Sequence, residues 1–387
     1  MAQPGAHDGT ERSSNTTLSK SEWLSYAEFG ERFVVHAVNR DRIEAAVSGM
    51  AGRGMVIGPF SIGPAGLAGL VAEGKVGKPV IARSEPRVTF EVRVPVSMHL
   101  TVTLGGQQFR VEATVEIDLT LHARTADPLV IVIDIPRVRA RDVSFAVRAE
   151  AIGAAVDVLL DPIATLVRRE VAARLNAMLA DPAARRGRVF DVEAIMNRTR
   201  SDHVLRTDFE WIEYAEFGRR FFPLIVTADR VRDVVEGLAG RAIEVGPLRT
   251  GPGDAATVGV KGIVRMPRLT RRPGDDPVSF DLAIPVGLDI TVDVLKANRY
   301  RAEVEVALLL VARAGEPLLI VIDVTPPRST DVTVDLQAEG WRAKVLGSVG
   351  KIRRQIAAQV AQVIRAELAD PRGRTIDVAG RIDSATS

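Results

Sequence analysis

The chain has 387 residues, 46% of them hydrophobic, and is therefore long enough to fold as two domains with buried cores. Its 51 Lys and Arg residues are nearly balanced by 49 Asp and Glu residues, which argues against nucleic acid as a partner. The absence of cysteine excludes disulfide bonds, thiolate metal sites and a cysteine nucleophile. Since the polar N-terminus has no apolar signal segment and no apolar run is long enough to span a bilayer, we expect a soluble, cytoplasmic protein.

The sequence contains an internal repeat. Eight of the eleven residues from Trp23 to Phe33 recur between Trp211 and Phe221. Three further segments recur in the same order and at nearly the same separation: residues 58–64 and 246–252, residues 127–134 and 316–323, and residues 179–182 and 368–371. Such ordered matches predict a tandem duplication with two homologous domains. The predicted boundaries are a disordered tail at 1–20, a first repeat at 21–199, a linker at 200–208, a second repeat at 209–383 and a short tail at 384–387.

Each repeat begins with the aromatic block, followed by a short helix. In the second repeat residues 220–226 combine a proline with bulky apolar residues, which favours an edge strand over a helix. The matching residues 33–38 fit either structure. A short amphipathic helix is predicted at 41–50 in the first repeat and at 229–238 in the second, each with an acidic residue near its start.

A set of strands follows the short helix. Apolar and polar residues alternate strictly from Val111 to His122, and the segment from Val88 to Val94 repeats the pattern one strand earlier. A period of two means that one face of each strand is buried and the other is in contact with water. We therefore expect an antiparallel sheet that is covered on one face only.

The segment after the strands is predicted to supply the cover. Apolar residues at spacings of three to five form a stripe along one long helix in each repeat, from Leu166 to Leu179 in the first and from Val349 to Leu368 in the second. Each helix ends at an Ala-Asp-Pro sequence and precedes a last short strand. The predicted fold class is α+β, with two tandem homologous domains that each pack a curved antiparallel sheet on a long amphipathic helix.

The sequence carries no recognisable catalytic or metal-binding motif. Its five histidines form no pair at metal-binding spacing, and it has no nucleophile elbow and no complete phosphate-binding loop. The acidic residues that recur in both repeats are interpreted as turn, cap and salt-bridge residues: Glu28 and Glu216, Asp134 and Asp323, Asp142 and Asp331, Asp181 and Asp370, and Asp191 and Asp377. A paired-carboxylate enzyme would need two of them to converge in a cleft. We expect no catalytic residue, no metal and no cofactor, and we expect that the protein is not an enzyme.

Arginine clusters occur at 168–169, 185–188, 268–272 and 353–354. They lack interleaved aromatic residues, which argues against stacking on nucleic-acid bases. One interpretation places them on solvated loops and helix faces. The other is peripheral contact with an anionic membrane surface.

The order of these elements, from strand and helix through a curved sheet to a long amphipathic helix and a final short strand, resembles the tubular lipid-binding (TULIP-like) superfamily. The close of each repeat, from Leu166 to Val192 and from Ile352 to Val378, carries most of the likeness. The repeated Trp-x-x-Tyr-Ala-Glu-Phe-Gly and Gly-Pro-x-x-x-Gly-Pro blocks also resemble those of an actinobacterial family. The resemblance implies that each sheet wraps its long helix and leaves an apolar groove for a lipid or another hydrophobic small molecule.

The implied grooves would be lined by inward-facing strand residues and by the helix stripes. The candidate ligand-binding residues are Phe90, Val92, Val115, Ile117, Leu166, Val171, Leu175, Phe280, Leu282, Val304, Val306, Ile352, Ile356 and Val360. An alkyl chain bound there would gain about 0.8 kcal/mol per buried methylene. A fully packed core would contain the same residues, so the pattern alone leaves both a groove and a filled core open.

Two alternatives to a lipid carrier remain. The first is a structural or interaction scaffold with packed cores, whose recurring Trp23, Tyr26 and Phe29 bind a protein partner or a second copy of the chain in a homo-oligomer. The second is a helix-grip pocket fold. The strand after the long helix argues against that fold, because it normally ends on the helix.

Overall fold

The computed structural model describes residues 23–48, 51–62, 66, 68–84, 88–148, 159–197, 199, 208–250, 256–293, 297–338, 349–368 and 372–386. These residues form two compact units. The N-terminal sheet unit contains the described residues of 26–225 and 379–386, and the C-terminal sheet unit contains those of 23–25 and 226–378. The predicted tail at 1–20 and the linker residues 200–207 lie outside the described residues.

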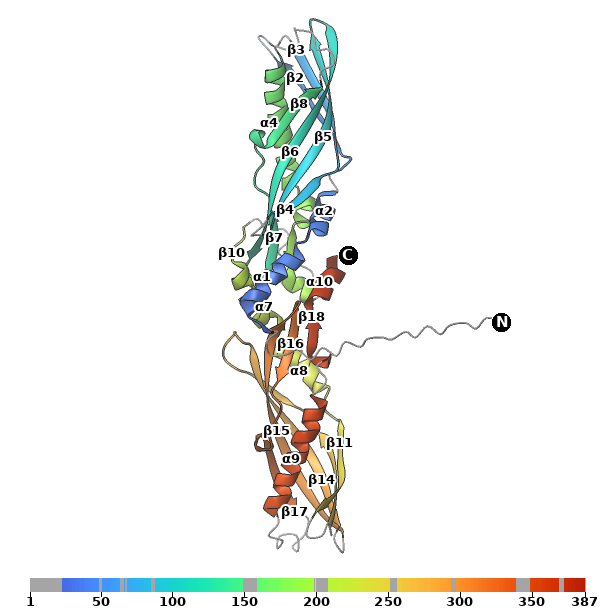
Figure 1. Cartoon of the computed structure of the whole chain (residues 1–387), viewed down its shortest axis with the longest axis vertical. Coiled ribbons are helices and arrows are strands. Elements are labelled where there is room, and N and C mark those ends of the chain that lie inside the picture. Colours follow the sequence, from blue (N-terminus) through green and yellow to red (C-terminus); the bar gives the residue numbers. More distant parts are fainter. Residues whose placement is uncertain are drawn as a thin grey trace, which may run out of the picture. The chain divides into compact units, whose positions relative to one another are not determined.

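Each unit consists of one curled antiparallel sheet with helices, so the predicted α+β class is confirmed (Figure 1). None of the helices in the described part of the chain is long and apolar enough to cross a membrane.

The sheet of the N-terminal sheet unit has the strand order β2-β3-β5-β6-β7-β9, with β4 paired to β5 and with β8 and β10 paired to β6. Its strands are β2 (Gly54–Ile62), β3 (Ala68–Val76), β4 (Val80–Ser84), β5 (Thr89–Leu104), β6 (Gln107–Ala126), β7 (Val130–Asp134), β8 (Val143–Arg148), β9 (Val189–Asp191) and β10 (Trp211–Ile212). The turn between β5 and β6 requires positive φ at Gly105 and Gly106, 57° and 83°, which glycine adopts without strain. The two long strands therefore form a continuous hairpin at the centre of the sheet.

The alternation expected from the sequence is present along this hairpin. Phe90, Val92 and Val94 are at most 3% exposed, whereas Glu91 and Arg93 between them are exposed. Removing one apolar face from water contributes about 25 cal/mol per Å² of buried area, which favours this register over a shift by one residue. The predicted strand pattern is thus confirmed.

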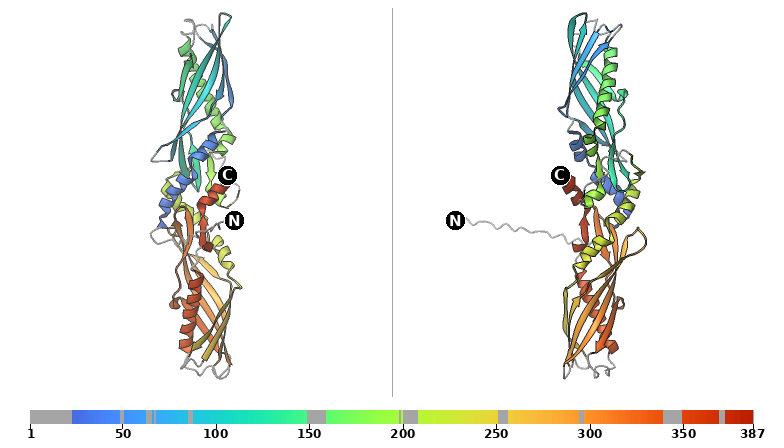
Figure 2. Two further views of the ribbon diagram at one scale, coloured as in Figure 1. Left: turned by 45° about the vertical axis from the view of Figure 1, so that its right-hand side comes forward. Right: turned by 180° about the vertical axis from the view of Figure 1, so that it is seen from behind.

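The helices of the same unit connect and flank its strands. They are α1 (Tyr26–Ala37), α2 (Arg40–Ser48), the 3₁₀ turn η3 (Ala140–Asp142), α4 (Leu160–Ala180), α5 (Pro182–Arg186), α6 (Val192–Asn197), α7 (Tyr214–Ile225) and, apart from its first residue, α10 (Val378–Thr386). The views in Figures 1 and 2 show α4 running lengthwise beside the sheet. Helix α10 includes residues 384–386, where the sequence predicts a tail.

The sheet of the C-terminal sheet unit has the order β11-β12-β14-β15-β16-β18, with β13 paired to β14 and with β1 and β17 paired to β15. Its strands are β1 (Trp23–Leu24), β11 (Ala242–Thr250), β12 (Ala256–Val264), β13 (Arg268–Arg271), β14 (Ser279–Asp293), β15 (Ala297–Gly315), β16 (Leu319–Val324), β17 (Val332–Ala338) and β18 (Thr375–Asp377). Its helical segments are α8 (Ala228–Glu236), η6 (Ser329–Asp331), α9 (Val349–Glu367) and η8 (Arg372–Arg374).

Two short strands carry the tryptophans of the aromatic blocks. In β10, Trp211 pairs with Ala126 of β6, and in β1, Trp23 pairs with Gly315 of β15. The block of the predicted first repeat thus adds a strand to the C-terminal sheet, and the block of the predicted second repeat adds one to the N-terminal sheet. The compact units therefore do not coincide with the contiguous ranges 21–199 and 209–383.

The prediction of an edge strand at 220–226 is wrong, because helix α7 extends to Ile225. Phe217, Phe221 and Ile225 are spaced by four residues and are at most 3% exposed. The Phe221 ring lies 5.1 Å from that of Phe29 on α1. Pro223 stands in the last turn of α7, where it removes a single helical hydrogen bond. Aromatic packing between helices thus overrides the local preference for a strand.

Helices α1 and α7 approach each other at two glycines. A Cβ atom on Gly218 would lie 1.9 Å from the carbonyl oxygen of Tyr26, and one on Gly30 would lie 2.2 Å from that of Tyr214. Tyr26 also stacks on Phe222 with ring centroids 3.8 Å apart. Tyr26, Phe29 and Phe217 therefore belong to the packed interior of a helix pair, whereas Tyr214 is partly buried and its hydroxyl donates a hydrogen bond to the carbonyl oxygen of Ala123 on β6.

Candidate ligand-binding interior

The strand candidates of the N-terminal sheet unit lie on one face of its central hairpin. Phe90 and Val92 of β5 and Val115 and Ile117 of β6 are all at most 2% exposed. Their alternation with exposed residues directs them to the same side of the sheet. The structure therefore brings these four candidates together in one apolar interior.

Helix α4 contributes a buried stripe. Val171 and Leu175 are 0% and 6% exposed, and the stripe continues through Val167 and Ile163, one and two turns before Val171. Leu166 is only partly buried and lies on the flank of this stripe. Ile163, Val167, Val171 and Leu175 follow one another at intervals of four residues, about one helical turn. Leu166 lies five residues before Val171 and therefore falls beside this stripe.

Helix α4 lies across the open side of the curled sheet. It contacts strands β2 and β8 and the turn η3. Strand β2 is at one edge of the sheet. Strand β8 pairs with residues 112–117 of β6 and forms the opposite edge of that half of the sheet. The helix thus contacts both edges of this half of the sheet. The region between α4 and strands β3, β5 and β6 is the candidate site.

One polar residue fastens α4 to the segment before η3. The side-chain amide of Asn176 accepts a hydrogen bond from the N–H of Val138 at 3.0 Å and donates one to its carbonyl oxygen at 2.8 Å. Both backbone groups of a buried residue are thereby satisfied. Sequence reasoning missed this contact, whose only local signal is an asparagine beside the apolar stripe.

Arg168 of α4 is partly exposed, although the alanines next to it along the helix face are buried. Ala164 and Ala172, one turn before and one turn after it, are 8% and 5% exposed. The Nε atom of Arg168 is buried and has no hydrogen-bond partner. A buried donor without a partner is uncommon in folded proteins and costs about 1–3 kcal/mol. The sequence pattern places Arg168 and Arg169 on a solvated helix face or at an anionic membrane surface, and it gives no sign that Nε of Arg168 is buried.

The C-terminal sheet unit has a corresponding apolar face. Phe280 and Leu282 of β14 and Val304 and Val306 of β15 are at most 4% exposed. Strand β14 pairs with β15 along its whole length. The structure therefore places the strand candidates of this unit together as well.

Helix α9 presents its stripe to the same unit. Ile356 and Val360 are 6% and 3% exposed, while the side chain of Ile352 lies outside the described part of the structure. Among the described residues, the extensive contacts of α9 are with β17 and η6. Arg353 of α9 also lies 3.9 Å from Asp335 of β17 in an exposed ion pair.

Several of the recurring acidic residues have structural partners, while Asp370 lies outside the described residues. Asp134 and Asp323 lie 3.4 and 3.8 Å from an arginine on the neighbouring strand. Asp142 and Asp331 each accept a hydrogen bond from the backbone N–H three residues earlier, and Asp191 accepts one from the N–H three residues later. Within the described ranges no group of three potential metal ligands occurs.

Glu216 fastens the aromatic block of α7. Its carboxylate accepts hydrogen bonds from Arg220 at 2.8 Å and from Arg219 at 2.9 Å, and these bonds lower the pKa of Glu216. Arg220 also donates a hydrogen bond to Asp127 in the turn between β6 and β7. The charges of the block therefore serve to anchor the helix.

An arginine that follows each long helix caps the C-terminal end of that helix. The guanidinium of Arg188 donates to the carbonyl oxygen of Leu179 at 2.6 Å, and that of Arg374 donates to Leu368 at 2.6 Å. Burial lowers the pKa of Arg188. Cations at a helix C-terminus also interact favourably with the helix dipole. These two arginines are therefore part of the fold.

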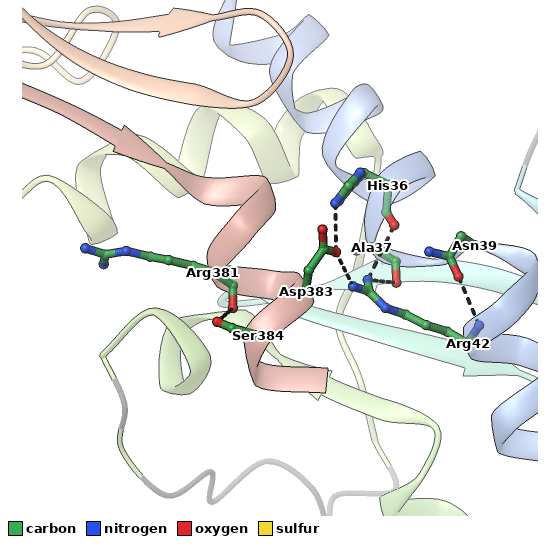
Figure 3. Close-up of polar contacts among 7 residues, drawn as sticks. All are labelled: His36, Ala37, Asn39, Arg42, Arg381, Asp383 and Ser384. Atoms are coloured by element: carbon green, nitrogen blue, oxygen red, sulfur yellow. Dashed lines mark hydrogen bonds and ion pairs between the residues drawn. The ribbon is translucent and has the colours of Figure 1, made fainter. Parts of the chain in front are cut away.

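The C-terminal helix α10 is held by a small polar cluster (Figure 3). Asp383 accepts a hydrogen bond from Arg42 at 2.7 Å and lies 3.1 Å from Nε2 of His36. Arg42 also donates to the carbonyl oxygen of Ala37 at 2.7 Å and so caps α1. His36 and Asp383 are both partly or largely exposed, and the cluster is a surface contact between helices.

No protein-family model matches the sequence, and no curated protein is significantly similar to it. Among solved structures, the crystal structure of lipopolysaccharide binding protein is similar at 9% sequence identity and a TM-score of 0.29, covering 90% of this chain and 89% of that chain. P47 from Clostridium botulinum A2 is similar at 7% identity and a TM-score of 0.25, covering 90% of this chain and 88% of that chain. TM-scores this low assign neither a fold nor a function.

Proposed function

We propose that the protein binds a lipid or another hydrophobic ligand without catalysis, in the apolar interiors between each curled sheet and its long helix. We further propose that the two units arose by tandem duplication. The observation that carries the proposal is the contact of α4 with both β2 and β8. It encloses a long apolar face that an alkyl chain would match, at about 0.8 kcal/mol gained per buried methylene.

Binding requires the long helix to move. Phe90 and Val115 are 0% exposed, so their surfaces already contact other side chains. A ligand would separate α4 from an edge strand and replace these contacts with contacts to its alkyl chain. Exchange of one apolar contact for another leaves the hydrophobic term nearly unchanged, so helix movement sets the cost of loading.

The test is native mass spectrometry of the purified full chain, paired with organic extraction and lipid analysis. A bound mass that reappears as a phospholipid or fatty acid in the extract supports the proposal. An apo mass with no uptake of added dodecanoate or 1-dodecanol rejects it.

A matched pair of variants locates the ligand. Ala72 of β3 is 0% exposed and faces the interior, whereas the next residue, Glu73, is exposed. Ala72→Phe should fill the interior and lower lipid uptake, while Glu73→Phe adds the same ring on the opposite face and should leave uptake unchanged. Circular dichroism of both variants controls for folding. Equal uptake by both variants would place the ligand elsewhere.

The second candidate function is a scaffold whose cores are packed without a ligand. The complete burial of Phe90 and Phe280 supports it. It predicts a clean apo mass. Tyr26 and Phe29 pack inside the α1–α7 helix pair, so a partner would have to contact the tryptophans of the blocks, of which Trp211 is exposed.

A further inference from the structure

The two long helices are held on their sheets in different ways. Helix α4 contacts β2 at one edge of its sheet and β8 and η3 at the other. Within the described ranges, the extensive contacts of α9 are with β17 and η6, which follow β16 as β8 and η3 follow β7. Helix α4 is therefore held along both edges of its sheet, and α9 mainly along one.

Asn176 adds a polar anchor to α4. Its side-chain amide accepts a hydrogen bond from the N–H of Val138 at 3.0 Å and donates one to the carbonyl oxygen of Val138 at 2.8 Å. At the matching positions the C-terminal sheet unit has Arg365, which is exposed, and Pro327, which has no N–H. Movement of α4 away from this segment must break both hydrogen bonds, whereas α9 has no such pair to break.

This difference affects how often each helix opens. Ligand uptake, as proposed above, requires the long helix to separate from a sheet edge. Two hydrogen bonds that break on opening lower the open population by about tenfold to a hundredfold. Burial of the helices differs in the same way, because Leu175 of α4 is 6% exposed and the matching Ile364 of α9 is only partly buried.

We infer that a ligand with an alkyl chain enters the C-terminal sheet unit first, between α9 and the edge strand β11, and that Asn176 is a latch that delays entry into the N-terminal sheet unit. This inference rests on the proposed function and adds to it the order and the control of loading. The apolar interiors select the alkyl chain, and the hold on each helix sets the rate at which that chain enters.

The experiment follows uptake of the fluorescent fatty acid cis-parinarate by the full chain in a stopped-flow instrument. Ala72 of β3 and Val260 of β12 are 0% and 6% exposed and face the two interiors, so Ala72→Phe and Val260→Phe each fill one of them. Wild type should take up the probe in two phases whose rates differ by about tenfold to a hundredfold. Val260→Phe should remove the fast phase, and Ala72→Phe should remove the slow phase.

Two substitutions open the latch. Asn176→Ala removes both hydrogen bonds. Asn176→Asp keeps the size of the side chain and an acceptor for the N–H of Val138, but it places a carboxylate without N–H donors beside the carbonyl oxygen. Both should accelerate the slow phase and leave the fast phase unchanged. Arg365→Ala is the matched control and should change neither phase, because Arg365 donates only to Ala361 of its own helix among its described contacts.

The outcomes separate the inference from the proposed function. Uptake by the wild type in a single phase, or loss of the fast phase in Ala72→Phe, overturns the order of loading. An unchanged slow phase in the Asn176 variants overturns the latch, and if circular dichroism shows that Asn176→Ala is unfolded, the isosteric Asn176→Asp decides. In each of these cases the protein still binds the probe and the proposed function stands. Absence of uptake by the wild type overturns both.

Discussion

Helices α4 and α9 differ most in how each contacts the segment just before a 3₁₀ turn, which is η3 for α4 and η6 for α9. In the N-terminal sheet unit, Asn176 of α4 exchanges two hydrogen bonds with the backbone of Val138. Aligning the two predicted repeats places Arg365 and Pro327 at the corresponding positions of the C-terminal sheet unit. Arg365 donates at 3.1 Å to Ala361 of its own helix, and proline has no N–H to offer. The two-way amide contact, which we call the Asn176 clasp, therefore has no counterpart there.

The inward-facing residues of the C-terminal sheet are also less completely buried than those of the N-terminal sheet. The paired residues Leu70 and Val102 in the N-terminal sheet are both 0% exposed. Their counterparts Val258 and Val292, which also pair, are 7% and 8% exposed. The stripes of α4 and α9 are alike in spacing, so apolar pattern alone does not determine how completely a helix covers a sheet. A single side-chain amide that satisfies two backbone groups distinguishes the two units.

The largest expected effect comes from truncating the stripe at matched positions. Leu175 is 6% exposed, and its counterpart Ile364 is only partly buried. Leu175→Ala should lower the free energy of unfolding by about 2–5 kcal/mol, because it leaves a cavity in a packed interior. Ile364→Ala should cost clearly less. Urea unfolding of both variants measures the difference, and equal losses would contradict a less complete cover over the C-terminal sheet.

The next effect tests the Asn176 clasp directly. Asn176→Ala leaves the N–H and carbonyl oxygen of Val138 without their partner, which should cost about 1–3 kcal/mol. Hydrogen exchange should then accelerate along α4. Arg365→Ala is the matched control and should change stability by less than about 0.5 kcal/mol, because its contact lies within one helix turn. Similar effects of the two variants would show that the clasp does not hold α4.

The C-terminal ends of α4 and α9 are capped alike, so we expect matched substitutions there to lower stability equally. Arg188 and Arg374 each donate to a carbonyl oxygen at the end of their helix, both at 2.6 Å. Arg188→Ala and Arg374→Ala should each lower stability by about 1 kcal/mol, the typical net contribution of one such hydrogen bond. Thermal unfolding measures both. A large loss for only one of them would mean that the helices differ at their ends as well as in the middle.

Local periodicity explains which parts of the fold the sequence could predict. The alternation over 111–122 and the three-and-four spacing of the long helices are properties of single segments, and both elements form as expected. Helix α7 was mispredicted because its stability comes from Phe29 and Phe33 on α1, which lie far away in sequence. The pairing of β1 with β15 and of β10 with β6 is equally non-local.

The candidate site was predictable in part for the same reason. Inward strand residues such as Phe90 and Phe280 follow from the period of two. Asn176 acquires its significance only from its contacts with the backbone of Val138. A polar residue near an apolar stripe has no distinctive spacing, so its partner must be seen before its role can be assigned.

The smallest expected effect is a gain, obtained by building the clasp into the C-terminal sheet unit. Pro327→Val restores a backbone N–H, and Arg365→Asn supplies the amide that can accept from it and donate to the adjacent carbonyl oxygen. The double variant should raise the free energy of unfolding by about 1 kcal/mol and slow hydrogen exchange along α9. Arg365→Asn alone should achieve less, because Pro327 offers only its carbonyl oxygen. If hydrogen exchange along α9 is as fast in the double variant as in the wild type, the amide contact does not determine how closely the helix packs on the sheet. The Asn176 clasp would then be a consequence of the close packing of α4, and the looser packing of α9 would result from its smaller contact with the sheet edges.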